Sequence, residues 1–281
     1  MIRPERRTTR LVARAPGKVN LSLFVGAPRE DGLHPLVSVV QAVSLADELT
    51  LEPAGGDADE VVCPGIDGPN LAARALTLFR EATGWDGPPQ RLEIVKRVPV
   101  AAGMGGGSGD AAAALRLAAH AAGGAPPALL HELAVRLGAD VPSQLAPGRV
   151  LMTGAGERVE SLPEPEPFAL VIVPSPHALS TPDVYAEFDR LGTTRGPDEL
   201  EAAAAAARRG ETPPVNDLQD AARALCPAID DALAALPGAM VSGSGPTVFS
   251  VDPAAVEAAR ALPGAVVARP VTACFAEVRA A

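Results

Sequence analysis

The sequence predicts an α+β protein built from two domains. At 281 residues the chain can bury a substantial core, and its length fits either one large domain or two of moderate size. Alternating apolar and polar stretches predict paired strands, helical stretches separate them, and a Pro/Glu-rich stretch at 162–167 divides the chain. We therefore expect an N-terminal domain at residues 1–162 and a C-terminal domain at residues 163–281.

The first domain alternates strands and helices. Apolar alternation and short apolar runs predict strands at 11–25, 36–51, 91–98 and 149–153. Helices are expected at 70–83, with Asn70 as N-cap, and at 127–137, ending at Gly138. Asp140 then falls in a turn, because Pro142 discourages further helix.

The second domain is predicted to be a small sheet with helices. A short buried strand is expected at 168–173, with helical segments at 182–209 and 217–236. Two apolar stretches, 238–241 and 247–251, flank the sequence Ser-Gly-Ser-Gly-Pro, and a helix and a final strand follow. The Ser-Gly-Ser-Gly-Pro turn is either a hairpin connector or a polar backbone loop that faces a cleft.

The junction between a strand and the next helix is the most informative segment. Residues 99–115 are Pro-Val-Ala-Ala-Gly-Met-Gly-Gly-Gly-Ser-Gly-Asp-Ala-Ala-Ala-Ala-Leu. Glycines expose bare backbone N–H groups, and the helix adds unpaired N–H donors and the positive end of its dipole, so the junction is suited to hold phosphate. The glycine spacing matches neither a P-loop nor a dinucleotide-binding fingerprint. The alternative is a flexible glycine turn before an ordinary helix.

The charge balance argues against a nucleic-acid or anionic-membrane partner, since 34 acidic and 24 basic residues give a net charge of −10. Residues 1–16 lack the apolar core of a secretion signal, and no apolar run reaches the roughly 20 residues that span a bilayer. We therefore expect a soluble, cytoplasmic protein. The histidines and cysteines show no metal-ligand spacing, and reduced thiols are expected at Cys63, Cys226 and Cys274.

The chain contains two lysines, Lys18 and Lys96, although it is rich in arginine. Each lies beside a loop: Lys18 follows the turn Ala-Pro-Gly, and Lys96 precedes the glycine cluster. A lysine retained against an arginine bias suits a place that needs a compact ammonium, and chance is the alternative.

Three segments together resemble the three motifs of the GHMP small-molecule kinases, in the right order. They are Ala-Pro-Gly-Lys-Val-Asn at 15–20, Gly-Met-Gly-Gly-Gly-Ser at 103–108 and Val-Ser-Gly-Ser-Gly-Pro at 241–246. Further segments, at 29–34, 137–142 and 216–217, are similar to the members of that family that phosphorylate a cytidyl-linked methylerythritol. The resemblance covers nearly the whole chain.

The resemblance implies an N-terminal domain of the ribosomal-protein-S5 type and a ferredoxin-like C-terminal domain, with ATP and a small-molecule substrate meeting in the cleft. It implies transfer of phosphate from ATP to a 2-hydroxyl in non-mevalonate isoprenoid precursor synthesis. A homoserine or mevalonate-type kinase and a non-catalytic nucleotide-binding regulator are the alternatives, and the intact Lys18 and Asp140 argue against the regulator. Mg²⁺ is expected because ATP carries it, with no ligands identified. The oligomeric state is not predicted.

Residue roles follow from the same resemblance. Asp140 would be the general base and Lys18 would lie beside it, where the pairing keeps the carboxylate ionised and the cation helps stabilise developing charge. ATP would be bound by Asn70, Lys96, Pro99, Val100, Ala101, Ala102, Gly103, Met104, Gly105, Gly106, Gly107, Ser108 and Gly109. The substrate would be bound by Asn20, His34, Tyr185, Ser242, Gly243, Ser244 and Gly245.

Two positions depart from the family pattern. Gly109 stands where a second serine is usual, which removes one hydroxyl from the loop. Leu33 stands where a tyrosine usually precedes the histidine, which removes one of two rings that would sandwich a cytosine base. The remaining ring would be Tyr185, and His34 would hydrogen-bond the edge of the base.

Overall fold

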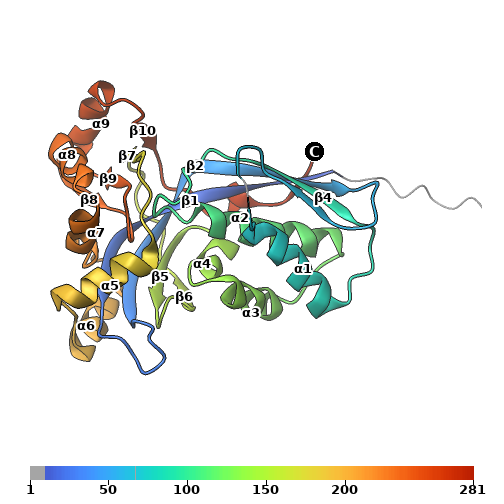
Figure 1. The fold of residues 1–281 in the computed structure, drawn as a ribbon, viewed down its shortest axis with the longest axis horizontal. Coiled ribbons are helices and arrows are strands. Elements are labelled where there is room, and N and C mark those ends of the chain that lie inside the picture. The colour runs from blue at the N-terminus through green and yellow to red at the C-terminus, as the bar shows by residue number, and fades with distance from the viewer. Residues whose placement is uncertain (1–9, 67) are drawn as a thin grey trace, which may run out of the picture.

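The computed structural model describes residues 10–66 and 68–281. In these residues the chain forms a seven-stranded sheet and a four-stranded sheet, with helices packed on both. Figure 1 shows α1 to α4 beneath one face of the larger sheet and α7 to α9 beside the smaller one. The predicted α+β class is confirmed. Among the described helices, none has the length and apolar character needed to cross a bilayer.

The larger sheet has the order β11-β1-β2-β4-β3, and β5 pairs with both β2 and β6. Its strands are β1 (Leu11–Val25), β2 (Leu36–Pro53), β3 (Glu60–Val62), β4 (Gln90–Val95), β5 (Arg149–Thr153), β6 (Arg158–Ser161) and β11 (Arg279–Ala280). The helices on it are α1 (Leu71–Thr83), α2 (Gly106–Ala121), α3 (Pro127–Leu137) and α4 (Val141–Leu145).

The smaller sheet has the order β10-β7-β9-β8. Its strands are β7 (Leu170–Val173), β8 (Ala239–Val241), β9 (Val248–Ser250) and β10 (Val266–Ala268). The remaining helices are α5 (Thr181–Leu191), α6 (Pro197–Arg208), α7 (Gln219–Leu225), α8 (Ala228–Ala235) and α9 (Pro253–Ala258), with short 3-10 turns η1 (Ala259–Ala261) and η2 (Ala273–Ala276). Of these, α6 packs on β2 and β5 of the larger sheet, and η2 contacts β1.

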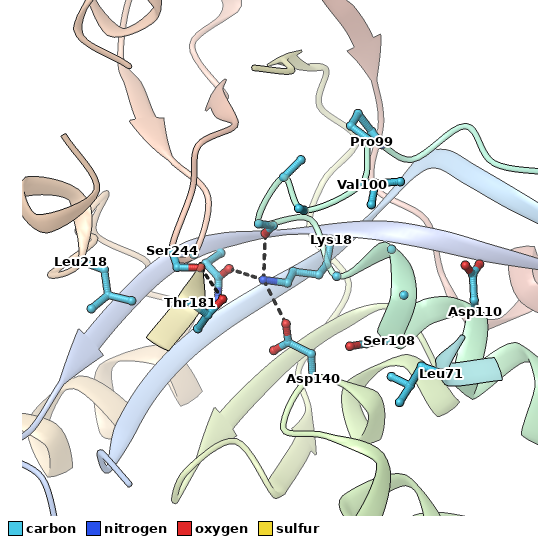
Figure 2. Close-up of a pocket in the computed structure, with 18 of the residues that line it drawn as sticks. Lys18, Leu71, Pro99, Val100, Ser108, Asp110, Asp140, Thr181, Leu218 and Ser244 are labelled. Carbon is cyan, nitrogen blue, oxygen red and sulfur yellow. Dashed lines mark hydrogen bonds and ion pairs between the residues drawn. The ribbon is translucent and has the colours of Figure 1, made fainter. Parts of the chain in front are cut away.

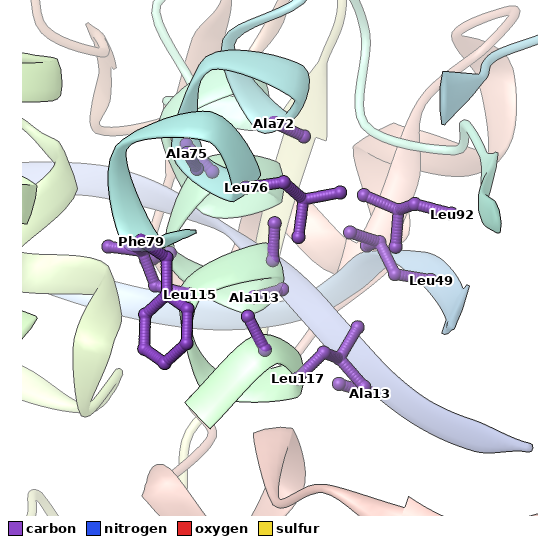
Figure 3. Close-up of a cluster of buried hydrophobic side chains, with 14 of the residues drawn as sticks. Ala13, Leu49, Ala72, Ala75, Leu76, Phe79, Leu92, Ala113, Leu115 and Leu117 are labelled. Carbon is purple, nitrogen blue, oxygen red and sulfur yellow. The ribbon is translucent and has the colours of Figure 1, made fainter. Parts of the chain in front are cut away.

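Helix α2 is the centre of the N-terminal core. Its alanines and leucines are buried on nearly every side, because α1 covers one face and β1 and β2 the other. Figure 3 shows Leu76 of α1 directed toward Leu49 and Leu92 of the sheet, and Phe79 of α1 next to Leu115 of α2. The small alanine side chains allow these layers to approach closely. The start of α2 is therefore fixed in place by the core behind it.

A bulge in β1 frees the Lys18 N–H to bond to the glycine loop. The β1–β2 ladder shifts register between Pro16 and Lys18, where proline supplies no N–H for pairing. The N–H of Lys18 instead donates to the carbonyl of Met104 at 2.9 Å, which ties the strand to the glycine loop. Lys18 and Asn20 then lie on the same face of the strand, because side chains repeat every two residues.

The far end of β1 joins the C-terminal part of the molecule. Leu23 bridges to Asn216, and the Asp217 carboxylate accepts a hydrogen bond from the Val25 N–H at 2.9 Å. Arg195 donates to Asp217 at 2.8 Å from the opposite side. The last strand, β11, returns to the N-terminal sheet and pairs with the beginning of β1. The domain boundary expected at residue 162 stays a prediction. Residues 279–280, which belong to the expected C-terminal domain, are part of the larger, N-terminal sheet.

Several predicted boundaries were wrong for identifiable reasons. The helix expected at 182–209 is broken at Gly192, and the one expected at 217–236 is broken before Pro227. Pro142 does not prevent a helix after Asp140, because it lies in the first turn of α4, where no N–H partner is lost. The expected strand 91–98 ends at Val95.

Candidate active site

A cavity of about 450 Å³ lies where β1, the glycine loop, the start of α4 and the 243–244 turn meet. Figure 2 shows Lys18 in the middle of it, with Asp140 and Ser244 on either side and Asp110 at the far end. Of the expected site residues, the cavity is lined by Lys18, Asn20, Asn70, Lys96, Pro99, Val100, Ala101, Ala102, Gly103, Gly105, Gly106, Gly107, Ser108, Asp140, Tyr185, Gly243 and Ser244.

Five expected residues do not line this cavity, and each lies just behind it. They are His34, Met104, Gly109, Ser242 and Gly245. The Met104 side chain is buried in the core. A Cβ on Gly109 would lie 3.2 Å from the Pro16 carbonyl oxygen, so a side chain at 109 would face β1 and not the cavity. Ser242 donates its hydroxyl to the Gly103 carbonyl at 3.2 Å and so supports the loop from behind.

The Lys18 ammonium is held by oxygen atoms from separate parts of the chain. Its Nζ donates to Asn20 Oδ1 at 2.8 Å and to the Gly103 carbonyl at 3.1 Å, and it lies 3.5 Å from Asp140 Oδ2. The Asn20 amide in turn donates to Ser38 at 2.8 Å, which fixes its oxygen toward Lys18. The lysine side chain is 5% exposed. These partners hold the ammonium in one position.

Asp140 reaches the cavity because of how the chain turns between α3 and α4. It occupies the position before the first residue of α4 and makes no capping hydrogen bond with its side chain. The side chain is 37% exposed, and its carboxylate faces Lys18. A carboxylate that is accessible and paired with a fixed ammonium can accept a proton from a bound hydroxyl group.

Two glycines of the loop are required by their surroundings. Gly103 has φ +71°, and a Cβ there would overlap the Ser242 carbonyl oxygen and lie 2.8 Å from that of Gly245. Gly105, the N-cap of α2, has φ +65°, and a Cβ would lie 3.1 Å from Lys18 Cε. Gly107, in contrast, is already helical and has open space around it.

The N-terminus of α2 is directed at the cavity. Gly106, Gly107 and Ser108 form its first turn and line the cavity wall. The N-cap residue is Gly105, which has no side chain to accept a hydrogen bond from the N–H groups of this turn. The first N–H groups and the positive end of the helix dipole therefore face the open space, an arrangement that binds phosphate.

A second ionic cluster lies at the opposite end of the cavity. Lys96 Nζ donates to Asp110 Oδ2 at 2.7 Å and also to Asp47 Oδ2. Burial opposes the charge of Lys96, but the two carboxylates outweigh it and raise the lysine pKa. Sequence reasoning did not single out Asp47 or Asp110. The available local signal was an acidic residue near the start of a helix that follows a glycine run.

Tyr185 and His34 form an aromatic pair on the other side of Asp140. Their ring centroids are 4.9 Å apart with an interplanar angle of 43°. Burial, and secondarily Asp140, raises the pKa of Tyr185 to about 12. His34 Nδ1 is 2.8 Å from the Gly26 carbonyl, and Nε2 is 3.5 Å from the Asp189 carboxylate. Leu33 is 52% exposed and does not line the cavity.

Family comparisons agree with this arrangement. Models described as "GHMP kinases N terminal domain" and "GHMP kinases C terminal" match residues 70–148 and 195–267. The fold and the site therefore define the class of protein as a GHMP kinase.

Comparison with individual relatives identifies the family within the GHMP kinases. The 4-diphosphocytidyl-2-C-methyl-D-erythritol kinase of Kineococcus radiotolerans is 43% identical, covering 85% of this chain and 80% of that protein. The kinase of the same name from Streptomyces coelicolor is 42% identical, covering 84% and 86%. A crystal structure of a 4-(cytidine 5'-diphospho)-2C-methyl-D-erythritol kinase has a TM-score of 0.74 at 35% identity, covering 92% of this chain and 98% of that one. The chain belongs to this kinase family within the GHMP kinases.

More distant structures share the fold alone. A homoserine kinase from Cytophaga hutchinsonii has a TM-score of 0.71 at 18% identity, covering 99% of both chains. A mevalonate kinase has a TM-score of 0.65 at 11% identity, covering 92% of this chain and 98% of that one. The expected GHMP kinase fold is confirmed, and the chain is a small-molecule kinase, for which ATP is a fitting phosphoryl donor.

Proposed function

We propose that this chain transfers the γ-phosphoryl group of ATP to the 2-hydroxyl of 4-diphosphocytidyl-2-C-methyl-D-erythritol, a step of non-mevalonate isoprenoid precursor synthesis. The observation that carries the proposal is the pair of Lys18 and Asp140, 3.5 Å apart, in the cavity that receives the N-terminus of α2. A cation, a carboxylate and a phosphate cradle are the groups that phosphoryl transfer to an alcohol requires. The names of the relatives suggest the substrate.

Each group has a separate task in the proposed reaction. The backbone N–H groups of Gly106 to Ser108 bind the ATP phosphates. Asp140 accepts the proton of the substrate hydroxyl, whose oxygen forms a bond to the γ-phosphorus as the bond from phosphorus to the ADP oxygen breaks. Lys18, held in place by Asn20 and Gly103, stabilises the negative charge that develops between them. Mg²⁺ is expected to arrive on the ATP phosphates, where it neutralises charge, and we assign it no protein ligand.

The substrate side of the cavity contains Tyr185 and the hydroxyls of Thr181 and Ser244. The two hydroxyl oxygens are 2.9 Å apart and line the same wall. We propose that the Tyr185 ring stacks on the cytosine base, with His34 packed against the ring from behind. In this arrangement His34 positions Tyr185, and its contact with the base edge stays a prediction.

An ADP-release assay tests the proposal. The purified chain is given ATP with 4-diphosphocytidyl-2-C-methyl-D-erythritol, homoserine or mevalonate, and we expect turnover with the cytidyl substrate alone. Efficient turnover of homoserine or mevalonate would leave a GHMP kinase with a different substrate. Binding of ADP without turnover of any of the three would favour a regulator and would refute the proposed activity.

A further inference from the structure

The cluster of Asp47, Lys96 and Asp110 has more negative than positive charge. Two carboxylates share one ammonium, so the cluster has a net charge of −1 when both are ionised. All three side chains are largely buried: their exposed fractions are 0% for Asp47, 5% for Asp110 and 15% for Lys96. An uncompensated charge at such a place is costly, because protein interior solvates it poorly.

The two carboxylates are not equally stabilised. Asp47 accepts hydrogen bonds from Lys96, from the Arg97 N–H and, at 2.8 Å, from the Val98 N–H. Asp110 accepts one from Lys96, and its Oδ1 is buried without a hydrogen-bond partner among the described residues. Asp47 thus has three hydrogen-bond donors, whereas Asp110 has one. Asp110 is therefore the carboxylate that takes a proton most readily.

Among the described residues, Lys96 is the one cationic side chain that contacts Asp110. Lys96 follows β4, Asp47 belongs to β2, and Cys63 follows β3. Burial and the Asp110 carboxylate raise the pKa of Cys63, so this thiol stays neutral near pH 7. The cavity-lining residues at the start of α1 are uncharged. Burial, opposed by Lys96 and assisted by Asp47, raises the pKa of Asp110 to about 7.

A nucleotide in this cavity adds further negative charge. Asp110 and Lys96 line the cavity together with Asn70 and the first turn of α2, where the proposed function places ATP. We propose that nucleotide binding by this chain shifts the Asp110 carboxylate toward its neutral, protonated form, so that binding takes up a fraction of a proton from the solvent. This inference rests on the proposed ATP site. Asp110 would then act as a positioning residue that presents Lys96 to the nucleotide.

The sign of the pH dependence follows directly. If the nucleotide disfavours the ionised form of Asp110, the protonated protein binds more tightly, and affinity falls as the pH rises through about 7. If binding raises the pKa of Asp110 by about one unit, affinity falls about five- to tenfold between about pH 6.5 and pH 8.5.

Calorimetric titration with ADP and Mg²⁺ tests the inference on the whole chain. Titrations at about pH 7.5 in two buffers of different ionisation enthalpy count the protons taken up, and we expect about half a proton per ADP for the wild type. Asp110→Asn, which is neutral at every pH, should take up less and should lose the fall in affinity. The exposed Asp86 is the matched control, and Asp86→Asn should behave as the wild type. All three proteins bind the same ligand, so protons taken up or released by ADP itself contribute equally to each measurement and cancel in the comparison.

Each outcome separates this inference from the proposed function. Equal proton uptake by wild type and Asp110→Asn would overturn the inference while leaving the nucleotide site intact. Failure of the wild type to bind ADP at any pH would overturn both. If Asp110→Asn does not fold, infrared difference spectra of the wild type still decide: ADP should produce the carbonyl stretch of a newly protonated buried carboxylic acid, and its absence would refute the proposal.

Discussion

A pair of glycine substitutions separates the glycines that the loop requires from those it only tolerates. Gly105→Ala places a side chain at φ +65°, where the left-handed conformation costs about 1–2 kcal/mol for a residue with a Cβ, and pushes on the Lys18 stem 3.1 Å away. Gly107→Ala enters open space at a helical position, where alanine gains up to about 1 kcal/mol over glycine. The free energies of unfolding should therefore differ by about 2–3 kcal/mol, with Gly107→Ala the more stable.

Chemical unfolding of the free protein measures the stability difference, and steady-state kinetics gives a second readout. Gly105→Ala should lower kcat, because displacement of the Lys18 stem moves the ammonium from its oxygen partners. Gly107→Ala should raise the KM for ATP, because Gly107 lines the cavity, and should leave kcat nearly unchanged. Equal stabilities, or a less stable Gly107→Ala, would show that the loop geometry described above is wrong.

Three further substitutions address other parts of the site. Asp140→Asn should lower kcat by about 10²-fold or more while ADP affinity by calorimetry stays nearly unchanged, and near-normal turnover would remove the general-base assignment. Tyr185→Ala should raise the KM for the cytidyl substrate about 5- to 150-fold, since base stacking contributes about 1–3 kcal/mol, whereas Tyr185→Phe should retain the wild-type value. Gly103→Ala should lower the melting temperature more than Gly105→Ala does, because it adds an overlap with the Ser242 carbonyl to the left-handed strain, and equal losses would contradict this packing.

Local patterns predicted the long elements well. Strand β1 begins and ends at the expected residues, and so do β5 and α3. The signals of β1 and α3 are strong because alternation or helical periodicity extends over many residues, while the five-residue β5 is a short apolar run that begins directly after Pro147 and Gly148. Asn70 caps α1 through its side chain as expected, with its oxygen accepting the Ala72 N–H at 2.9 Å.

Features that depend on distant parts of the chain were not predictable in this way. The short strands β3, β6 and β11 exist because partner strands pair with them, and their own sequences contain little signal. The cluster around Lys96 depends on bringing β2, the end of β4 and the start of α2 together, so nothing local distinguished Asp47 from other acids on a strand. The sequence motifs did indicate Lys18 and Asp140, but not that the Gly103 carbonyl would share the ammonium with Asn20.

The continuity of β1 limits how the molecule can open and close. This strand pairs with β2 along its whole length, while its far end is tied to Asn216 and, through Asp217, to Arg195. A rotation of the C-terminal half against this strand would break the backbone hydrogen bonds that join Leu23 to Val215 and Asp217. The short stretch 99–101 of the glycine loop lies outside the β1–β2 ladder, and its residue Val100 is 57% exposed. Entry and release of the nucleotide should therefore involve movement of this segment relative to the fixed β1–β2 sheet, and not a hinge motion between domains.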